Sequence, residues 1–383
     1  MEIKAAVTPA AGQAFVYESL HLETPRDDEV LVQIKGVGIC HTDLVVSGGG
    51  MPFPFPAVLG HEGAGIVKAV GTKVSKVTPG DHVLISFRSC GSCDRCDQGR
   101  AAYCRSSAAL NYSGRREDGT TPLQDQRSQA VSANFFGQSS FATEAITYER
   151  NVVPVDASLP IELLGPLGCG VQTGVGSILR SLKVEAGSSV LIVGGGAVGL
   201  SAVMGAVIAG CSHIVLVEPV EARRTLAKEF GATATVDPVR EPEWVKGLRR
   251  AFPLGFDFAL DTSGAAPAQE GALKCLASMG TLGLVGLGAK ENKPPGRANL
   301  LVTNGQTIRG ILEGDSDPDT FLPELVSYFQ QGRLPFDRMI QTFPLARINE
   351  AVDAVHRGSC IKAVLIPDEP SAPRREEEVQ SGR

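Results

Sequence analysis

The pattern of apolar and polar positions changes near residue 170. Before that point, short apolar or partly alternating runs at 30–35, 65–70 and 83–85 are separated by Gly- and Pro-containing segments. Short runs bounded by turn residues are typical of strands joined by tight connections. The first 150 residues are therefore predicted to form a barrel-like, mostly antiparallel β domain.

Beyond residue 170, apolar strands alternate with helical segments. The run at 189–193 is apolar throughout, as expected of a strand buried on both faces, and an Ala- and Val-rich helical segment follows it. Further elements are predicted as strands at 213–218, 256–261, 281–287, 307–312 and 360–366, and as helices at 221–230, 321–330 and 348–356. Alternation of this kind predicts a parallel sheet covered by helices, so the fold class is α/β with a doubly wound sheet.

Composition narrows the class of protein. The 383 residues are enough for two domains, and 43% of them are hydrophobic, as in ordinary globular proteins. A net charge of −6 argues against a nucleic-acid partner, and no apolar run approaches the ~20 residues that span a bilayer. The first residues lack the apolar core of a signal peptide, so we expect a cytoplasmic protein without a membrane partner. Residues 368–383, rich in Pro, Glu and Arg, are predicted to be a disordered tail.

Four cysteines lie close together in one short segment, at Cys90, Cys93, Cys96 and Cys104. Four thiolates at this spacing, separated by Gly and polar residues, suit a closed tetrahedral zinc site. Such a site would stabilise a lobe that has little apolar material of its own. Two disulfides, or four unrelated cysteines, are the alternatives; neither fits a chain without secretory features.

A glycine-rich loop follows the predicted strand at 189–193. Gly194, Gly196 and Gly199 match the G-x-G-x-x-G pattern of dinucleotide-binding loops, although the same pattern also occurs in plain tight turns. The loop follows a strand and opens a helix, and Glu218 ends the next strand, where a carboxylate binds ribose hydroxyls. These features predict NAD rather than NADP. Arg223 could partly offset the repulsion of a 2′-phosphate, or it lies on a solvated helix face.

Five cysteines lie outside the four-cysteine lobe, and two of them have neighbours that suggest a metal. Cys40 stands in the segment GVGICHTD and Cys169 in GPLGCGVQTG, while His61 stands in LGHEG. Two thiolates and one imidazole leave a fourth position for substrate, which is the pattern of catalytic zinc. Because these residues are far apart in sequence, spacing alone cannot select them. The remaining cysteines are predicted to be small buried residues: Cys211, Cys275 and Cys360.

With these motifs the chain resembles the zinc-dependent medium-chain alcohol dehydrogenases, over residues 1–367. The resemblance is carried by the following features: Cys40 with Thr42 and Asp43, Gly60-His61-Glu62, the four-cysteine lobe, Cys169 and the glycine-rich loop. It implies a GroES-like catalytic domain at 1–169 with a structural zinc lobe at 88–106. It further implies a Rossmann NAD-binding domain at 170–312 and a return to the catalytic domain at 313–367.

The resemblance also implies roles for single residues. Cys40, His61 and Cys169 would bind a catalytic zinc, and Glu62 would lie beside it as a further or transient ligand. Asp43 would orient His61. Thr42 would bind the substrate oxygen and pass on its proton. The implied cofactor contacts are His41, Thr173, Val198, Val285, Leu312 and Lys362, although His41 also fits as a plain polar neighbour of Cys40.

One position departs from the best-known members of the family. Their proton relay ends on a histidine where this chain has Val45. The proton must therefore leave through water, the cofactor ribose or another base.

A narrower resemblance points to the aryl-alcohol branch, whose substrates include benzyl alcohol and the allylic alcohols geraniol and perillyl alcohol. It is carried by the segments 40–44, 134–142, 166–174 and 313–318. It implies a substrate with a primary hydroxyl beside a π-system. The predicted pocket residues, which fit a place in the core equally well, are Met51, Phe53, Phe87 and Leu110.

Other readings remain open. A broad-range primary alcohol enzyme, a polyol or formaldehyde-type enzyme and a quinone reductase belong to the same superfamily, but zinc-free quinone reductases lack the four-cysteine lobe. A nucleotide-binding regulatory protein without activity should have lost zinc ligands, which this chain retains. Members of the family form homodimers or homotetramers, and the sequence does not choose between them.

Overall fold

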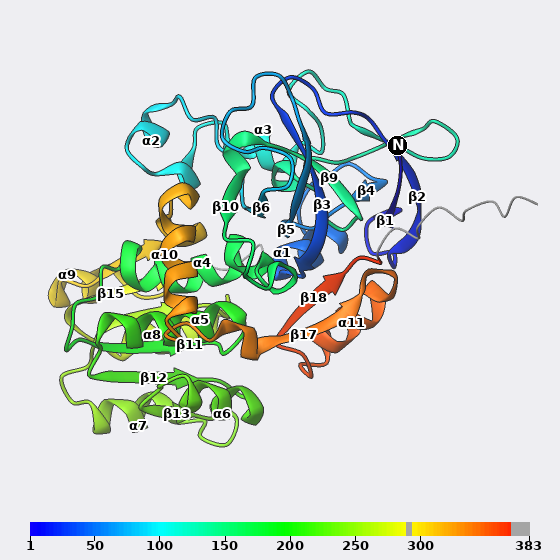
Figure 1. Ribbon diagram of the computed structural model, residues 1–383. Coiled ribbons are helices and arrows are strands. Elements are labelled where there is room, and N and C mark those ends of the chain that lie inside the picture. The colour runs from blue at the N-terminus through cyan, green and yellow to red at the C-terminus, as the bar shows by residue number, and fades with distance from the viewer. Residues whose placement is uncertain (289–292, 369–383) are drawn as a thin grey trace, which may run out of the picture.

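The computed structural model describes residues 1–288 and 293–368. Figure 1 shows a β-rich body built mainly from the first half of the chain, and an α/β body that carries most of the second half. The predicted C-terminal tail lies outside the described residues, apart from Asp368.

The β-rich body contains two sheets, and nearly all of its strand pairs are antiparallel. The smaller sheet has the order β4-β1-β2-β7-β8 and consists of β1 (Glu2–Thr8), β2 (Val16–Leu22), β4 (Ala57–Val58), β7 (Leu123–Gln124) and β8 (Ala130–Val131). The larger has the order β10-β6-β5-β3-β18-β17, with β9 beside β3, and consists of β3 (Glu29–Gly38), β5 (Glu62–Val70), β6 (His82–Ile85), β9 (Glu144–Tyr148), β10 (Val152–Val155), β17 (Ile340–Pro344) and β18 (Lys362–Ile366). The last two strands bring the end of the described chain back to the first body.

The α/β body is built on one parallel sheet with the order β13-β12-β11-β14-β15-β16. Its strands are β11 (Ser189–Val193), β12 (His213–Val217), β13 (Ala234–Val236), β14 (Phe256–Asp261), β15 (Leu276–Leu284) and β16 (Thr307–Gly310). The helices that follow these strands are α5 (Ala197–Ala209), α6 (Glu221–Glu229), α7 (Trp244–Ala251), α8 (Ala266–Lys274) and α9 (Ala298–Asn304). The doubly wound sheet expected from the apolar pattern is therefore present.

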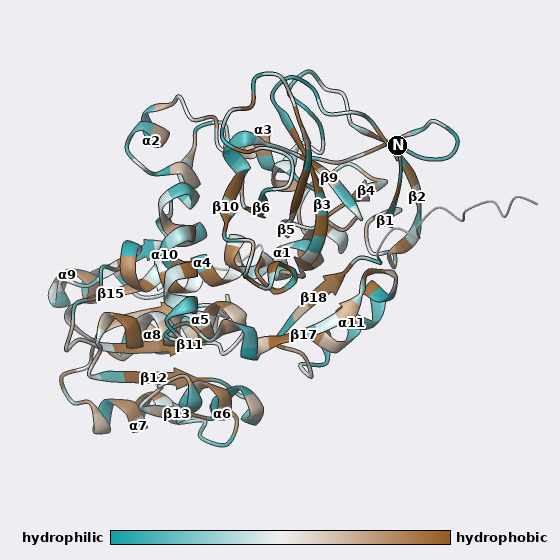
Figure 2. Ribbon diagram, in the orientation of Figure 1, coloured by the Kyte–Doolittle hydropathy of each residue, from teal (hydrophilic) through white to brown (hydrophobic). Residues whose placement is uncertain are grey.

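The remaining helices of the described residues are α1 (His41–Ser47), α2 (Asp94–Asp97), α3 (Ser107–Tyr112), α4 (Gly170–Gly176), α10 (Pro318–Gln330) and α11 (Ile348–His356). Apolar residues gather along strands such as β3, β10 and β18, as the brown ribbon in Figure 2 shows. One core cluster fills the β-rich body, and two clusters cover the opposite faces of the parallel sheet.

Several predicted strand ends differ from the structure, and two of these strands bear on the predicted cofactor contacts. The strand expected at 281–287 spans Leu276–Leu284, because its first residues extend the pairing with β14 across an irregularity opposite Phe256 and Phe258. The strand expected at 307–312 ends at Gly310, where its parallel pairing with β15 ends. Val285 and Leu312 therefore lie just beyond strand ends, in connections at one edge of the sheet.

Candidate active site

Cys40, His61 and Cys169 come together from three separate elements. Cys40 precedes α1, His61 precedes β5, and Cys169 precedes α4. Their ligand atoms all lie within 4.8 Å of one another. His61 is fully buried, and its Nε2 has no hydrogen-bond partner. A buried nitrogen without a partner is costly, so this donor set fits a zinc ion with one open position.

Asp43 holds the histidine in place. Its Oδ1 lies 2.9 Å from His61 Nδ1 and also accepts the Gly60 backbone N–H at 3.0 Å, while Oδ2 accepts the Cys40 backbone N–H at 2.9 Å. Asp43 is fully buried. Its carboxylate favours the proton on Nδ1, which leaves the Nε2 lone pair for a metal.

The groups around Cys40 stabilise its thiolate form. A hydrogen bond from Cys169, assisted by His61 and Lys362, holds the pKa of Cys40 well below its ordinary value against the effect of burial. Metals bind the thiolate form of cysteine. The electrostatics of the site therefore favour the thiolate form of Cys40, which can bind a metal.

Glu62 and Lys362 form a buried ion pair beside the three ligands. Lys362 Nζ lies 2.5 Å from Glu62 Oε2 and donates to the Ile39 carbonyl at 3.1 Å, and Gly170 N–H donates to Glu62 Oε1 at 3.1 Å. Burial raises the pKa of Glu62 to about 7, although Lys362 opposes the shift. The structure thus places Lys362 beside Glu62 and the Ile39 carbonyl, and its predicted contact with the cofactor pyrophosphate stays a prediction.

An aromatic platform lies against His61 and consists of Phe135, Phe136, Tyr112 and Phe53. The Phe136 ring stacks on the imidazole with centroids 4.3 Å apart and an angle of 19° between the rings. Phe135 meets His61 edge-on at 5.3 Å, and Tyr112 meets Phe136 edge-on at 5.2 Å. Sequence reasoning named Phe53 as a pocket residue and 134–142 only as typical of the aryl-alcohol branch, and it gave no role to Phe135, Phe136 or Tyr112.

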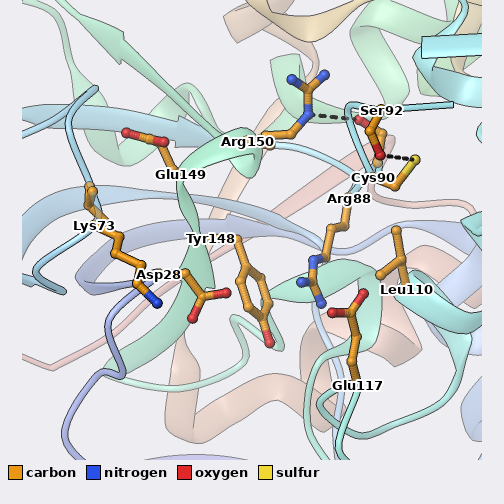
Figure 3. A pocket seen from close by; sticks show the side chains of 12 residues that line it. Asp28, Lys73, Arg88, Cys90, Ser92, Leu110, Glu117, Tyr148, Glu149 and Arg150 are labelled. Atoms are coloured by element: carbon orange, nitrogen blue, oxygen red, sulfur yellow. Dashed lines mark hydrogen bonds between the residues drawn. The ribbon is translucent and has the colours of Figure 1, made fainter.

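The four predicted pocket residues separate in the structure. Phe53 joins the aromatic platform through an edge-on contact with Phe135 at 5.3 Å, and Met51 packs partly buried against the same core cluster. Phe87 is a buried member of that core. Leu110 instead lines a largely polar pocket with Arg88, Cys90 and Glu117, as Figure 3 shows. The structure places Phe87 in the core and Leu110 at this polar pocket, and a contact of either residue with substrate stays a prediction.

Glu313 is a buried acid that sequence reasoning did not single out. Its Oε1 lies 3.6 Å from Cys169 Sγ, and its Oε2 lies within 3.3 Å of the Thr173 hydroxyl. Burial raises its pKa to about 7. A charged residue in the short turn Glu313–Asp315 carries no spacing signal, so only the fold reveals this contact.

The residues predicted around the nicotinamide lie on neighbouring elements. Thr173 on α4 and Val198 on α5 come together because the helices pack closely at Gly174, where a Cβ would approach the Val198 carbonyl to 2.2 Å. Thr42 lies beside Cys40, with 3.9 Å between its hydroxyl and the sulfur, whereas His41 is exposed. The contacts of these residues with the cofactor or substrate stay predictions.

The glycine-rich loop borders a cavity of about 550 Å³ at the carboxyl ends of β11 and β12. Gly194 has a φ of 96°, Gly196 leaves open space where a Cβ would stand, and a Cβ on Gly199 would meet the Gly194 carbonyl at 1.8 Å. Glu218 and Arg223 line the same cavity. The loop therefore has the conformation and the space that a pyrophosphate needs.

The four-cysteine lobe forms a second cluster with metal-binding geometry. The four sulfur atoms lie within 4.8 Å of one another, and the two nearest, those of Cys93 and Cys96, are 3.6 Å apart. Every one of the nine cysteines is free, which removes the disulfide alternative. The set fits a closed structural zinc site.

Among the described residues, no helix is long and apolar enough to cross a membrane.

Each of the two bodies matches a known protein family model. Residues 26–157 match the family model described as alcohol dehydrogenase GroES-like domain, and residues 197–327 match zinc-binding dehydrogenase. The chain is 44% identical to a geraniol dehydrogenase of Castellaniella defragrans, over 95% of this chain and 97% of that protein. It is 34% identical to a probable S-(hydroxymethyl)glutathione dehydrogenase of Schizosaccharomyces pombe, over 96% of this chain and 97% of that protein.

A solved structure gives the same result. The benzyl alcohol dehydrogenase of Acinetobacter calcoaceticus superposes with a TM-score of 0.92 at 40% identity, covering 96% of this chain and all of the other. The resemblance and fold class inferred from the motifs are thereby confirmed. The chain belongs to the zinc-dependent alcohol dehydrogenase family, with a GroES-like domain joined to a Rossmann-type domain.

Proposed function

We propose that the protein oxidises aryl or allylic primary alcohols to aldehydes with NAD as the hydride acceptor. The observation that carries this proposal is the aromatic platform stacked on His61. A flat π-system beside the reacting hydroxyl can pack against such rings at favourable offset or edge-on angles. The similarity to a geraniol dehydrogenase and to a benzyl alcohol dehydrogenase supports the same substrate class.

Zinc and NAD would supply one part of the chemistry, and the side chains of the protein supply the other. Zinc supplies a positive charge that lowers the pKa of an alcohol, and NAD accepts the hydride. Cys40, His61 and Cys169 would hold the metal, and Asp43 keeps the imidazole in the tautomer that binds it. Glu62, paired with Lys362, provides a carboxylate next to the metal site.

Thr42 would accept the proton of the substrate hydroxyl and pass its own proton on, and a bound NAD would supply the acceptor for the hydride that leaves the carbinol carbon. The overall balance is alcohol plus NAD to aldehyde, NADH and one proton. Val45 has no group that can carry this proton. The proton therefore leaves through water, the cofactor ribose or another base.

Selection of NAD follows from Glu218. Its carboxylate lines the cavity beside the glycine-rich loop and accepts the backbone N–H groups of Gly195 at 2.5 Å and Val220 at 2.9 Å. A buried, ordered carboxylate at this position accepts ribose hydroxyls and repels a 2′-phosphate. Arg224 is engaged by Asp237 at 2.9 Å, whereas Arg223 lines the cavity and could offset part of this repulsion.

The test is NADH formation from benzyl alcohol, geraniol and ethanol at equal concentrations. We expect kcat/KM for benzyl alcohol or geraniol to exceed that for ethanol at least tenfold, roughly what ~1.4 kcal/mol of extra transition-state binding gives. Equal or better use of ethanol would reject the flat-pocket assignment. A preference for geraniol over benzyl alcohol would favour the second candidate, a terpene alcohol dehydrogenase, and equal use of all three would favour a broad-range enzyme.

We further propose a homodimer or homotetramer formed along β16. Within the described residues this edge strand pairs on one side only, with β15. The nearby apolar side chains of Met279, Val302 and Leu312 are exposed. Unpaired strand edges with apolar neighbours favour self-association. Light scattering on wild type and Val302→Lys would show the oligomer and its loss; a monomeric wild type would contradict the proposal.

A further inference from the structure

Tyr103 joins the four-cysteine lobe to a distant turn of the α/β body. It ends the 3₁₀ turn Ala101–Tyr103, directly before Cys104, and lies 212 positions from Asp315 in the sequence. Its hydroxyl donates to Asp315 Oδ1 at 2.6 Å and accepts the Leu312 backbone N–H at 3.1 Å. The two short turns, Ala101–Tyr103 and Glu313–Asp315, are in contact.

The other side of the same turn packs against Cys169, one of the candidate metal ligands. Glu313 lies against Cys169 and Thr173, as described above. Ser316 donates its hydroxyl to Gln172 Oε1 at 2.9 Å, on α4. The segment 312–316 is therefore held between the four-cysteine lobe and the helix that begins after Cys169.

The backbone of this turn needs outside support. Glu313 and Asp315 have φ values of 50° and 54°, in the left-handed region that residues other than glycine seldom adopt. Such conformations persist only where the surroundings over-determine them. Arg309 pairs with Asp315 and donates to the Ser181 carbonyl at 3.0 Å, so Tyr103 and Arg309 fix Asp315 from two sides.

We propose that Tyr103 is a positioning residue through which the four-cysteine lobe pre-forms the nicotinamide side of the cofactor site. This inference rests on the proposed function, because Leu312 is taken to shape the nicotinamide pocket. Without the hydroxyl, the turn is less ordered in the free protein. Cofactor binding must then supply the ordering, which lowers affinity.

The effect should be confined to one half of the cofactor. The adenosine half binds at the cavity beside the glycine-rich loop, which contains no residue of 312–316. ADP-ribose lacks the nicotinamide and reports on that half alone. A general loss of stability would weaken both ligands, whereas loss of the pre-formed turn weakens only NADH.

The experiment compares the zinc-replete wild type with Tyr103→Phe, which removes only the hydroxyl. We expect the Kd for NADH, measured by fluorescence titration, to rise about tenfold, the effect of losing one to two hydrogen bonds. The Kd for ADP-ribose should stay within about twofold. Hydrogen exchange of the free protein should become faster in the segment 312–316, because Leu312 N–H loses its acceptor.

Tyr328→Phe is the matched control. Its hydroxyl donates to Glu324 at 2.8 Å within α10, so the same atom is removed from a bond to the same kind of group, away from the turn. Neither ligand affinity nor exchange at 312–316 should change. Asp315→Asn changes the acceptor of the Tyr103 hydroxyl instead of Tyr103 itself. Asn tolerates a positive φ, and the change lies outside the four-cysteine lobe.

Unchanged exchange at 312–316 in both Tyr103→Phe and Asp315→Asn would overturn the role of Tyr103 in ordering the turn. Equal loss of NADH and ADP-ribose affinity would overturn its role in the nicotinamide pocket. A wild type that binds no NADH would instead count against the proposed cofactor, and the exchange measurement would still decide whether Tyr103 orders the turn. Zinc content of two ions per subunit in every variant excludes metal loss as the cause.

Discussion

Asp43 shows how one residue determines the chemistry of another. It contacts His61, Gly60 and the Cys40 backbone at once, so it positions two metal-ligand candidates from a single carboxylate. A partner of this kind fixes the histidine tautomer and raises its basicity as a ligand.

Asp43→Asn should therefore weaken zinc at the catalytic site by about 10- to 100-fold, because the amide is neutral and no longer favours the proton on Nδ1. Competition with a chromogenic chelator measures this affinity. The four-cysteine site is the internal control and should keep its metal. Loss of both ions together, or of neither, would contradict the role given to Asp43.

Phe136 is expected to select for aromatic or allylic substrates through its position on His61. Phe136→Ala should lower the ratio of kcat/KM for benzyl alcohol over ethanol about tenfold, since it removes an aromatic contact together with buried area. Phe343→Ala, which truncates an aromatic side chain packed on the same core cluster, is the control. A ratio that falls equally in both variants would mean that general destabilisation, not the platform, causes the change.

The residues of the site differ in how far sequence can predict them. Cys40, His61 and Cys169 are recognisable because their neighbours form family motifs, and the structure brings them together. Tyr112 carries no such motif, and Glu313 stands in the segment 313–318, which matches only the aryl-alcohol branch and assigns it no contact with Cys169. Their place near the site depends on how the turn at 312–316 and α3 pack, which no local pattern records.

At the scale of elements, the ends of β11 and β12 create the cofactor cavity. The parallel strands deliver the glycine-rich loop and Glu218 to the same edge of the sheet. Ligands bind at such edges in open α/β sheets.

Glu218→Gln should reduce discrimination between NAD and NADP about tenfold, chiefly because the repulsion of the 2′-phosphate is lost. The ratio of kcat/KM for the two cofactors measures it. Glu221→Gln, an exposed change at the start of α6, serves as the control. An unchanged ratio in Glu218→Gln would remove the basis for assigning NAD.

The four-cysteine lobe is an element that a bound metal would hold together. It contains only short helices, and its cysteines lie at or near the surface except for Cys104. Cys93→Ser should lower the zinc content from two ions to one per subunit and make 88–106 more sensitive to protease. Cys211→Ser, at a cysteine outside both clusters, should leave the zinc content unchanged. A Cys93→Ser protein that retains two ions would contradict the closed site.

Most elements of the sheets follow from local pattern. The apolar run at 189–193 and the alternation around 256–261 match β11 and β14 residue for residue. β15 starts earlier than expected because Leu276 pairs with Phe256 although the segment after it contains exposed residues. Pairing with a neighbouring strand overrides the local pattern there.

At the scale of the whole molecule, the site is where the two bodies meet. Cys40 and His61 come from the β-rich body, Cys169 stands at the start of the connection to the parallel sheet, and Glu313 reaches it from beyond β16. The metal and cofactor sites therefore share the helix α4 and the turn at 312–316. In the proposed function, this juxtaposition would place a hydroxyl bound beside Cys40 close to a nicotinamide beside Thr173.

The most direct measurement is zinc-edge anomalous diffraction from crystals grown with NADH and a non-reacting benzaldehyde analogue. The account predicts one peak between Cys40 Sγ, His61 Nε2 and Cys169 Sγ, a second peak among the four cysteines of the lobe, and the aromatic ring of the ligand against Phe136. No metal between the first three residues, or a ligand ring bound away from Phe136, would contradict it.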